Sequence, residues 1–134
     1  MIINQRFSNL FLFAACAFGA SLLLTSCATS RMHETNPPSA PFIQMLETAK
    51  NDDMEGFFNC FSERDTFGHN SNPNDFKEAQ TNLRSMYGDL DPSEFEFQFE
   101  GKDSHGVLVI IFKGEENLRI RVVKEGTEWK LDEH

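Results

Sequence analysis

The sequence predicts an α+β domain in which three helices precede a four-stranded antiparallel sheet and cover one of its faces. Two observations lead to this prediction. Between residues 42 and 87, apolar side chains recur every three or four positions, which is typical of amphipathic helices. From Glu94 onward apolar and polar residues alternate, and turn segments divide this part of the chain into four strands.

The first two helices are predicted on either side of the acidic break Asn51-Asp52-Asp53, which offers an N-cap to the second. Pro41 is a favourable first residue for the first helix. Its apolar face is made of Phe42, Ile43, Met45, Leu46 and Ala49. The second helix carries a stripe at positions i, i+3, i+4 and i+7, made of Met54, Phe57, Phe58 and Phe61.

The third helix is predicted after a polar, turn-rich segment at residues 62–73. Asn74 or Asp75 is the expected N-cap, and Gly88 supplies the C-terminal stop. The stripe expected to be buried consists of Phe76, Ala79, Leu83, Met86 and Tyr87.

The four strands are predicted at residues 95–100, 107–112, 118–122 and 127–132. A two-residue loop at Glu125-Gly126 would place Val122 opposite Trp129, Ile120 opposite Leu131 and Arg119 opposite Asp132. On the inner face, the second strand would then pair with the third through Leu108–Val122, Ile110–Ile120 and Phe112–Leu118.

An apolar run of 15 residues, Leu10–Leu24, follows Arg6 near the start of the chain and ends in small residues. This pattern indicates a secretory signal peptide. A permanent transmembrane helix is the weaker interpretation, because it would need about 20 apolar residues. A buried core helix is weaker still, because the run has no polar face.

The quartet Leu24-Thr25-Ser26-Cys27 resembles the lipobox of bacterial lipoproteins. The resemblance implies cleavage after residues 1–26, a diacylglycerol on the Cys27 thiol and usually an acylated amine, which together anchor a protein stably. In many lipoproteins of Gram-negative bacteria, the residue at the position of Ala28 is a sorting signal. Because this residue is not Asp, the resemblance implies that the protein is sorted to the outer membrane and faces the periplasm. A plain secretory signal, with Cys27 as an ordinary residue, is the alternative.

Residues 27–41 are expected to form the lipidated cysteine and a flexible tether rich in Ser, Thr, Asn and Pro. Fully extended, the tether would span roughly 40 Å at about 3.3 Å per residue. The folded domain is predicted at residues 42–134.

Composition limits the partners of the mature chain. Cleavage would leave 108 residues, enough for one small domain, and loss of Arg6 would change the formal net charge from −9 to −10. An acidic chain without a basic cluster argues against nucleic acid as a partner. With Cys16 removed and Cys27 acylated, Cys60 has no disulfide partner and is expected to be a buried structural thiol.

The order of elements resembles the NTF2-like superfamily. The motifs are the acidic helix break within Ala49–Glu55 and the terminal strand Glu128-Trp129-Lys130-Leu131. The resemblance covers roughly residues 42–133 and implies a curved sheet wrapped around helices into a cone whose mouth often forms a pocket. It also implies that the outer sheet face can form a dimer. No convincing strand is predicted between the second and third helices, which departs from a full cone.

Two candidate binding surfaces are considered, the first from this resemblance and the second from the apolar pattern of the second strand. A pocket inside the cone would be lined by Phe95, Phe97, Phe99, Met86 and Trp129. The second strand is apolar on both faces, so Val107, Val109 and Ile111 would project outward as a strip that is either covered or available to a protein partner or a second copy.

Catalytic and metal-binding motifs are weak. Enzymes of the superfamily use a His or an acidic residue inside the cone, and the candidates here are His69, Asp65, Asp75 and His105. None of them forms a dyad that spacing supports, so no catalytic residue is assigned. Neither His69 with Asp75 nor Asp89 with Asp91 supplies enough metal ligands, and no cofactor is expected.

The sequence therefore favours a non-enzymatic, lipid-anchored envelope protein that binds a protein or envelope component. The alternative is a small-molecule pocket of the NTF2-like type, in a carrier or in an isomerase- or hydratase-like enzyme. A purely structural spacer is the third reading.

Overall fold

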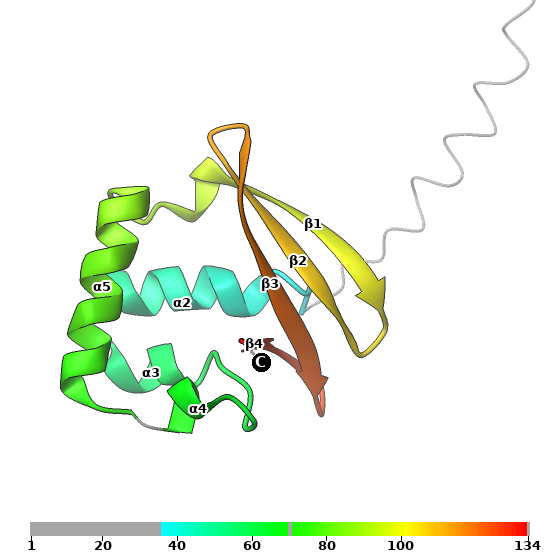
Figure 1. Ribbon diagram of the computed structural model, residues 1–134, viewed down its shortest axis with the longest axis horizontal. Helices are drawn as coiled ribbons and strands as arrows, with labels where there is room; N and C mark the ends of the chain where they lie inside the picture. Colours follow the sequence, from blue (N-terminus) through cyan, green and yellow to red (C-terminus); the bar gives the residue numbers. More distant parts are fainter. Residues whose placement is uncertain (1–35, 70, 134) are drawn as a thin grey trace, which may run out of the picture. The chain divides into compact units, whose positions relative to one another are not determined.

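The computed structural model describes residues 36–69 and 71–133. The predicted signal peptide and Cys27, and the predicted tether up to Thr35, lie outside these residues. The helices are α2 (Ala40–Lys50), α3 (Met54–Phe58), α4 (Thr66–His69) and α5 (Pro73–Tyr87), followed by the 3₁₀ turn η1 (Pro92–Glu94). The strands are β1 (Phe95–Lys102), β2 (His105–Phe112), β3 (Glu115–Glu125) and β4 (Glu128–Asp132). Helices followed by a four-stranded antiparallel open sheet confirm the predicted α+β class (Figure 1).

Residues that precede Phe42, the first predicted core residue, already contact the folded domain. α2 begins at Ala40 with Pro41 in its first turn, and Pro41 is buried. Upstream of the helix, the Asn36 side-chain amide donates to the Thr127 carbonyl oxygen at 3.1 Å. Asn36, which the sequence placed in the tether, is therefore in contact with the β3–β4 turn.

The second predicted helix is shorter than its apolar stripe indicates. α3 ends at Phe58, and the chain then pairs with β4 through the hydrogen bonds Leu131 N–H to Cys60 O (2.8 Å) and Ser62 N–H to Leu131 O (2.7 Å). Phe61 is buried, as its spacing predicted, but it lies in a parallel bridge to Leu131 and not on a helix. This bridge covers part of the free edge of β4, where the sequence indicated no strand.

The segment at residues 62–73, predicted as a polar turn region, contains the short helix α4. The described residues thus hold four α-helices where three were predicted. The N-cap of α5 is Asn72, and not Asn74 or Asp75, because Pro73 occupies the first helical turn. The Asn72 carboxamide oxygen accepts the Asn74 and Asp75 backbone N–H groups at 2.7 and 3.2 Å. Gly88 ends α5 at a φ of 65°, as predicted.

The strands follow one another in the sheet in chain order. The predicted registers are wrong by two residues: Val122 pairs with Leu131 and Arg121 with Asp132, while Leu108 pairs with Ile120. The β3–β4 loop is Gly126-Thr127, with Gly126 at a φ of 62°, a value that glycine adopts readily. A shift by two keeps every side chain of these pairs on its predicted face. The β2–β3 pairing is irregular between Ile110 and Ile111, so Phe112 lies opposite Glu115, three residues from its predicted partner Leu118.

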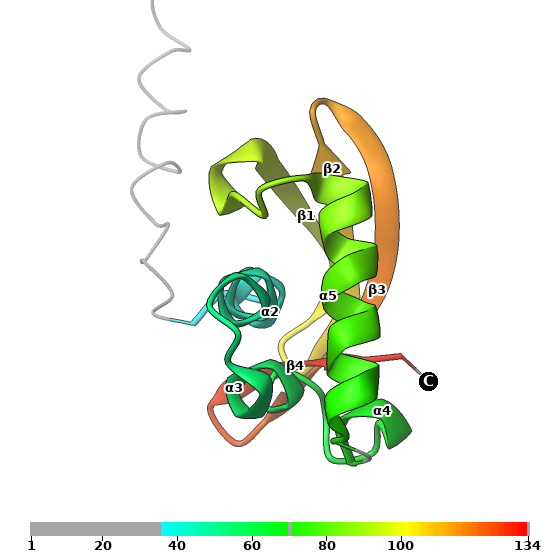
Figure 2. The ribbon, with the colours of Figure 1, turned by 90° about the vertical axis from the view of Figure 1, so that its left-hand side faces the viewer.

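The core lies between the helices and the inner face of the sheet. α2 crosses behind β3 in Figure 1, and Figure 2 shows α5 running along β3. Phe42 of α2 contacts the rings of Tyr87, Phe95 and Phe97 at centroid distances of 6.5, 5.6 and 5.9 Å. A second aromatic cluster joins α3, α4 and α5 and consists of Phe57, Phe58, Phe61, Phe67 and Phe76. The buried apolar core runs from Phe42 to Leu131, so this segment carries its own hydrophobic core.

Candidate functional site

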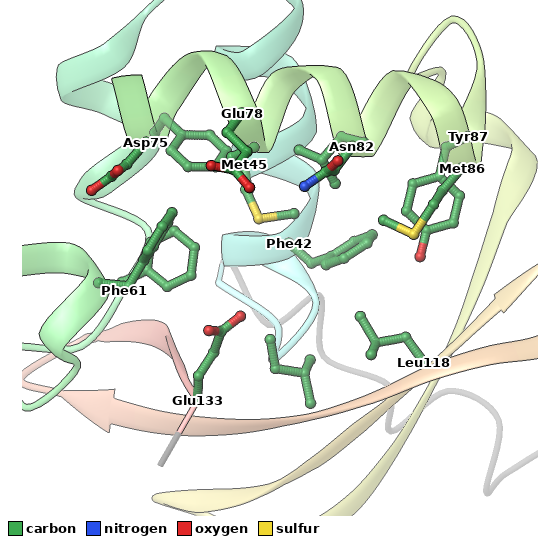
Figure 3. Close-up of a pocket in the computed structure, with 15 residues that line it drawn as sticks. Phe42, Met45, Phe61, Asp75, Glu78, Asn82, Met86, Tyr87, Leu118 and Glu133 are labelled. Carbon is green, nitrogen blue, oxygen red and sulfur yellow. The ribbon is translucent and has the colours of Figure 1, made fainter. Parts of the chain in front are cut away.

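A cavity of about 490 Å³ opens between α5 and β3, with α2 behind it (Figure 3). Its volume lies within the range of about 300–1,000 Å³ typical of small-molecule sites. The back wall is formed by Phe42 and Met45 of α2, and one end by Phe57, Phe61 and Phe67. Leu118 of β3 faces Met86 of α5 across the opening, and Ile120 and Leu83 also line the cavity. The lining is therefore mainly apolar and comes from elements far apart in the sequence.

Two large apolar side chains at the opening are accessible to solvent. Met86 is 54% exposed and Leu118 is 38% exposed, although both have apolar neighbours in the cavity wall. The prediction that Met86 belongs to the buried stripe of its helix is therefore wrong. The helix stripe is wider than the surface it covers, because α5 stands away from β3 at the cavity.

The polar lining consists mainly of oxygen-bearing groups. Asp75, Glu78 and Asn82 project from α5, and Glu133 rises from the segment after β4 (Figure 3). Tyr87 donates its hydroxyl to the Asn117 carboxamide oxygen at 2.6 Å, and burial raises the pKa of this phenol above its ordinary value. Among residues 36–69 and 71–133, no lysine, arginine or histidine lines the cavity.

Of the five residues predicted to line a pocket, Met86 lines this cavity and the other four lie elsewhere. Phe95 is buried between Tyr87 and Phe112, with ring centroids at 5.0 and 4.9 Å. Phe97 is half-buried against Phe42. These rings fill the space beneath β1 instead of bordering an opening.

Phe99 and Trp129 form a separate pair, with ring centroids 5.3 Å apart. Phe99 is 37% exposed, and Trp129 is buried with the Lys124 ammonium 5.7 Å from its ring centroid. The Trp129 indole nitrogen is buried and finds no hydrogen-bond partner in the described part of the chain. A buried indole N–H usually has a hydrogen-bond partner, so this unpaired donor lowers the stability of the fold locally.

The predicted outward strip of β2 is largely covered by the protein's own side chains. Val109 is only 2% exposed. Arg119, opposite Val109, reaches Glu100 on β1 in an ion pair of 2.6 Å that crosses over β2. The hydrogen bond to Glu100 and its charge raise the pKa of Arg119. Val107 and Ile111 on either side are half-buried, so the apolar area left open is smaller than the sequence indicated.

All four catalytic candidates make hydrogen bonds or polar contacts within the fold. Asp65 is 1% exposed, and its carboxylate accepts the backbone N–H groups of Phe67 and Glu133, each at 2.8 Å. The His69 imidazole contacts the Glu63 carbonyl oxygen, and His105 pairs with Ser104 at 3.1 Å, both on the exposed surface. Asp75 lines the cavity and accepts a hydrogen bond from the Asn72 amide at 3.0 Å. His69 and Asp65 share a hydrogen bond only between backbone groups, and among the described residues no side-chain hydrogen bond joins two of these four residues into a catalytic dyad.

Cys60 is buried, as predicted, and its thiol donates to the Gly56 carbonyl at 3.3 Å. Burial raises the pKa of this thiol to about 12, so it is protonated at neutral pH. Among residues 36–69 and 71–133, no three His, Cys, Asp or Glu side chains gather closely enough to hold a metal ion.

The cavity is the feature that the sequence did not reveal. Its residues lie on α2, α5, β3 and the C-terminal segment, and nothing local joins Phe42 to Leu118 or Glu133. One weak signal was present: Leu118 is an apolar residue at the polar beginning of a strand.

In the part of the chain that the structure describes, no helix is long and apolar enough to cross a membrane. Comparisons with protein-family models, curated proteins and solved structures find no significant match to this chain.

Proposed function

We propose that this protein is a lipid-anchored envelope protein of bacteria that binds an apolar or amphipathic small molecule without catalysis. The cavity between α5 and β3 is the observation that carries the proposal. It combines a suitable volume of about 490 Å³, an aromatic and aliphatic wall, and apolar side chains left exposed at its opening. A ligand that covered Met86 and Leu118 would remove apolar surface from water, which is the main driving force for such binding.

The anchor part of the proposal rests on the sequence. The lipobox-like quartet ending at Cys27 supports lipidation there, and Ala28 supports an outer-membrane position facing the periplasm. The described fold starts at Asn36, so residues 28–35 would separate the lipid from the domain. Over eight extended residues this separation is at most about 28 Å, at roughly 3.5 Å per residue.

The similarity to the NTF2-like superfamily is part of the same proposal. Helices first, then a strand meander ending in the Trp129 strand, and a cavity between sheet and helices are the features expected of a cone with a mouth. The sheet here is open, and Phe61 provides a parallel bridge at its β4 edge in place of a further strand.

A non-enzymatic role is favoured because three of the four predicted catalytic candidates lie outside the cavity lining. Asp65 holds two backbone N–H groups, and both candidate histidines are on the surface elsewhere. The lining does hold Asp75, Glu78, Glu133 and the Tyr87 hydroxyl, and this hydroxyl is bonded to Asn117. In the described part of the chain, no serine, threonine, cysteine or lysine lines the cavity to act as a nucleophile beside them.

The binding function can be tested on the soluble chain Ala28–His134, which contains the whole described core. Isothermal titration with hexanol, octanol and decanol should give saturable binding that tightens with chain length. Each added methylene should contribute about 0.8 kcal/mol while the cavity has room, so two methylenes should tighten binding about 15-fold.

Variants distinguish the cavity from other apolar surface. Leu118→Arg places a charge at the opening and should weaken binding of decanol, while Val107→Arg on the outer sheet face serves as the matched control. Absence of saturable binding for all three alcohols, with the chain folded by circular dichroism, would reject the proposed function.

A further inference from the structure

We infer that the cavity selects amphiphiles that carry an α-amino-acid unit, as N-acyl amino-acid amides and short acylated peptides do. This inference rests on the proposed function and adds the chemical class of the ligand. It comes from the backbone of β3 beside the cavity, where one residue presents its N–H and C=O groups to an unpaired sheet edge.

β3 is paired over only part of its length on the side of β4. β4 pairs with residues 121–125, whereas β3 begins at Glu115. In the described part of the chain, no other strand lies on this side of β3, so its edge before Arg121 is unpaired. Glu133 follows β4 directly and also lines the cavity. The cavity therefore borders β3 where a longer β4 would have continued.

The direction of the backbone groups follows from the pairing of β3. In an antiparallel sheet, the N–H and C=O of one residue point to one neighbouring strand, and those of the next residue point to the other. The Lys124 N–H donates to the Ser104 carbonyl oxygen at 2.7 Å, on the β2 side. The pairing with β2 is regular from there to Leu118, so even-numbered residues of this stretch bond to β2. The N–H and C=O of Arg119 therefore point to the opposite, unpaired edge.

Arg119 lies between two residues of β3 that line the cavity, Leu118 and Ile120. Its side chain extends away from the unpaired edge, because the guanidinium crosses β2 to reach Glu100 at 2.6 Å. Small-molecule sites typically combine apolar walls with a few polar groups that fix the orientation of the ligand, and backbone N–H and C=O groups are among these. The open backbone groups of Arg119 would have this role beside the cavity.

The two open groups match one amino-acid unit. In an antiparallel ladder, a hydrogen-bonded pair of residues exchanges two bonds, from the N–H of each residue to the C=O of the other. A ligand that carries N–H, Cα and C=O in succession can form both bonds with Arg119, as a peptide does when it adds to a sheet edge. An alcohol offers a single hydroxyl. The apolar tail of the ligand would enter the cavity between Leu118 and Met86 (Figure 3).

The test compares two probes that differ in one group: N-octanoylglycine methylamide, and the ester in which oxygen replaces the glycine N–H. Both are titrated calorimetrically into Ala28–His134, with decanol as the probe for the cavity itself. The ester cannot donate to the Arg119 carbonyl oxygen. We therefore expect the amide to bind about two- to tenfold more tightly, the range for one hydrogen bond.

Amide hydrogen exchange locates the contact on the unmodified chain. The Arg119 N–H should exchange rapidly in the free protein and become protected when N-octanoylglycine methylamide is bound. The Val123 N–H is the internal control, because Val123 pairs with Lys130 of β4 and should be protected in both states.

A pair of variants tests the Arg119 N–H directly. Arg119→Pro removes this donor, and proline is tolerated where the N–H faces an unpaired edge. Arg119→Ala loses the same side chain but keeps the N–H, so it is the reference. We expect Arg119→Pro to bind N-octanoylglycine methylamide about two- to tenfold more weakly than Arg119→Ala, with both variants folded by circular dichroism.

The outcomes separate this inference from the proposed function. Equal affinity for the amide and the ester would overturn the inference, and so would an Arg119 N–H that is protected in the free chain or unprotected in the complex. Saturable binding of decanol would then leave the proposed function in place. Absence of saturable binding for decanol and both probes would overturn both.

Discussion

Asp65 should stabilise the fold as a clamp between the α4 region and the end of β4. Its buried carboxylate accepts the N–H groups of Phe67 and Glu133 at 2.8 Å each. Asp65→Asn keeps one acceptor oxygen but turns an amide donor toward the other N–H. Loss of one hydrogen bond to a charged group costs about 1.5–3 kcal/mol. With a urea m-value of about 1.5 kcal/mol/M, the unfolding midpoint should fall by about 1–2 M.

Urea unfolding followed by circular dichroism measures this effect, and Asp103→Asn in the exposed β1–β2 turn is the matched control. Amide hydrogen exchange at Glu133 gives a local readout, since this N–H should lose protection in Asp65→Asn. If Asp65→Asn and Asp103→Asn unfold at the same urea concentration as the parent chain, the clamp argument is wrong.

The remaining predictions concern Cys60, Leu46, Asn72 and Cys27. Cys60 in the folded chain should react with iodoacetamide at pH 8 far more slowly than in urea, by peptide mass spectrometry, because burial raises its pKa to about 12; equal rates would contradict its burial. Since this pKa exceeds the unfolded value of 9.0, the contribution of Cys60 to stability should fall as pH rises from about 9 toward 12. Leu46→Ala, at a position with 0% exposure, should cost about 2–5 kcal/mol in urea unfolding, whereas Leu118→Ala at the cavity opening should cost much less; similar costs would contradict the difference in burial. Asn72→Ala should cost about 1 kcal/mol through the lost cap of α5, and no loss would show that the cap is dispensable. Cys27→Ser should abolish palmitate labelling and membrane association; labelling that persists would refute the anchor.

The sequence was sufficient to predict the α+β class because two different apolar periods follow one another along the chain. It was insufficient to predict the β3–β4 register. Alternation defines which face a side chain occupies, but a slide by two residues leaves every face unchanged. The predicted register was preferred because it pairs Val122 and Ile120 with apolar residues on one face and forms an ion pair at Asp132 on the other, whereas a slip by one residue would place a charged residue opposite Val122. In the structure, Asp132 forms its ion pair with Arg121 instead. Glu125 lies opposite Glu128, and Gly126 is the first residue of the turn, with a positive φ.

Helix length and end points depended on tertiary contacts that no local pattern reports. The spacing of Met54, Phe57, Phe58 and Phe61 fits a helix, yet the chain leaves the helix after Phe58. Two backbone hydrogen bonds to Leu131 replace the helical ones and bring Phe61 to the same core. The burial of these residues was therefore predictable, whereas their secondary structure was not.

The structure also changes where a binding surface is expected. Over the outer sheet face, the Arg119–Glu100 ion pair crosses β2 and leaves Val109 with 2% exposure, so a partner would have to displace this pair to reach the valine. On the helix side, Met86 and Leu118 are exposed at the opening of an existing cavity, and a ligand in the cavity could cover both. Binding there removes apolar surface from water and requires no rearrangement of the sheet. For this reason the opening between α5 and β3, and not the strip at Val107, Val109 and Ile111, is the surface on which binding should first be measured.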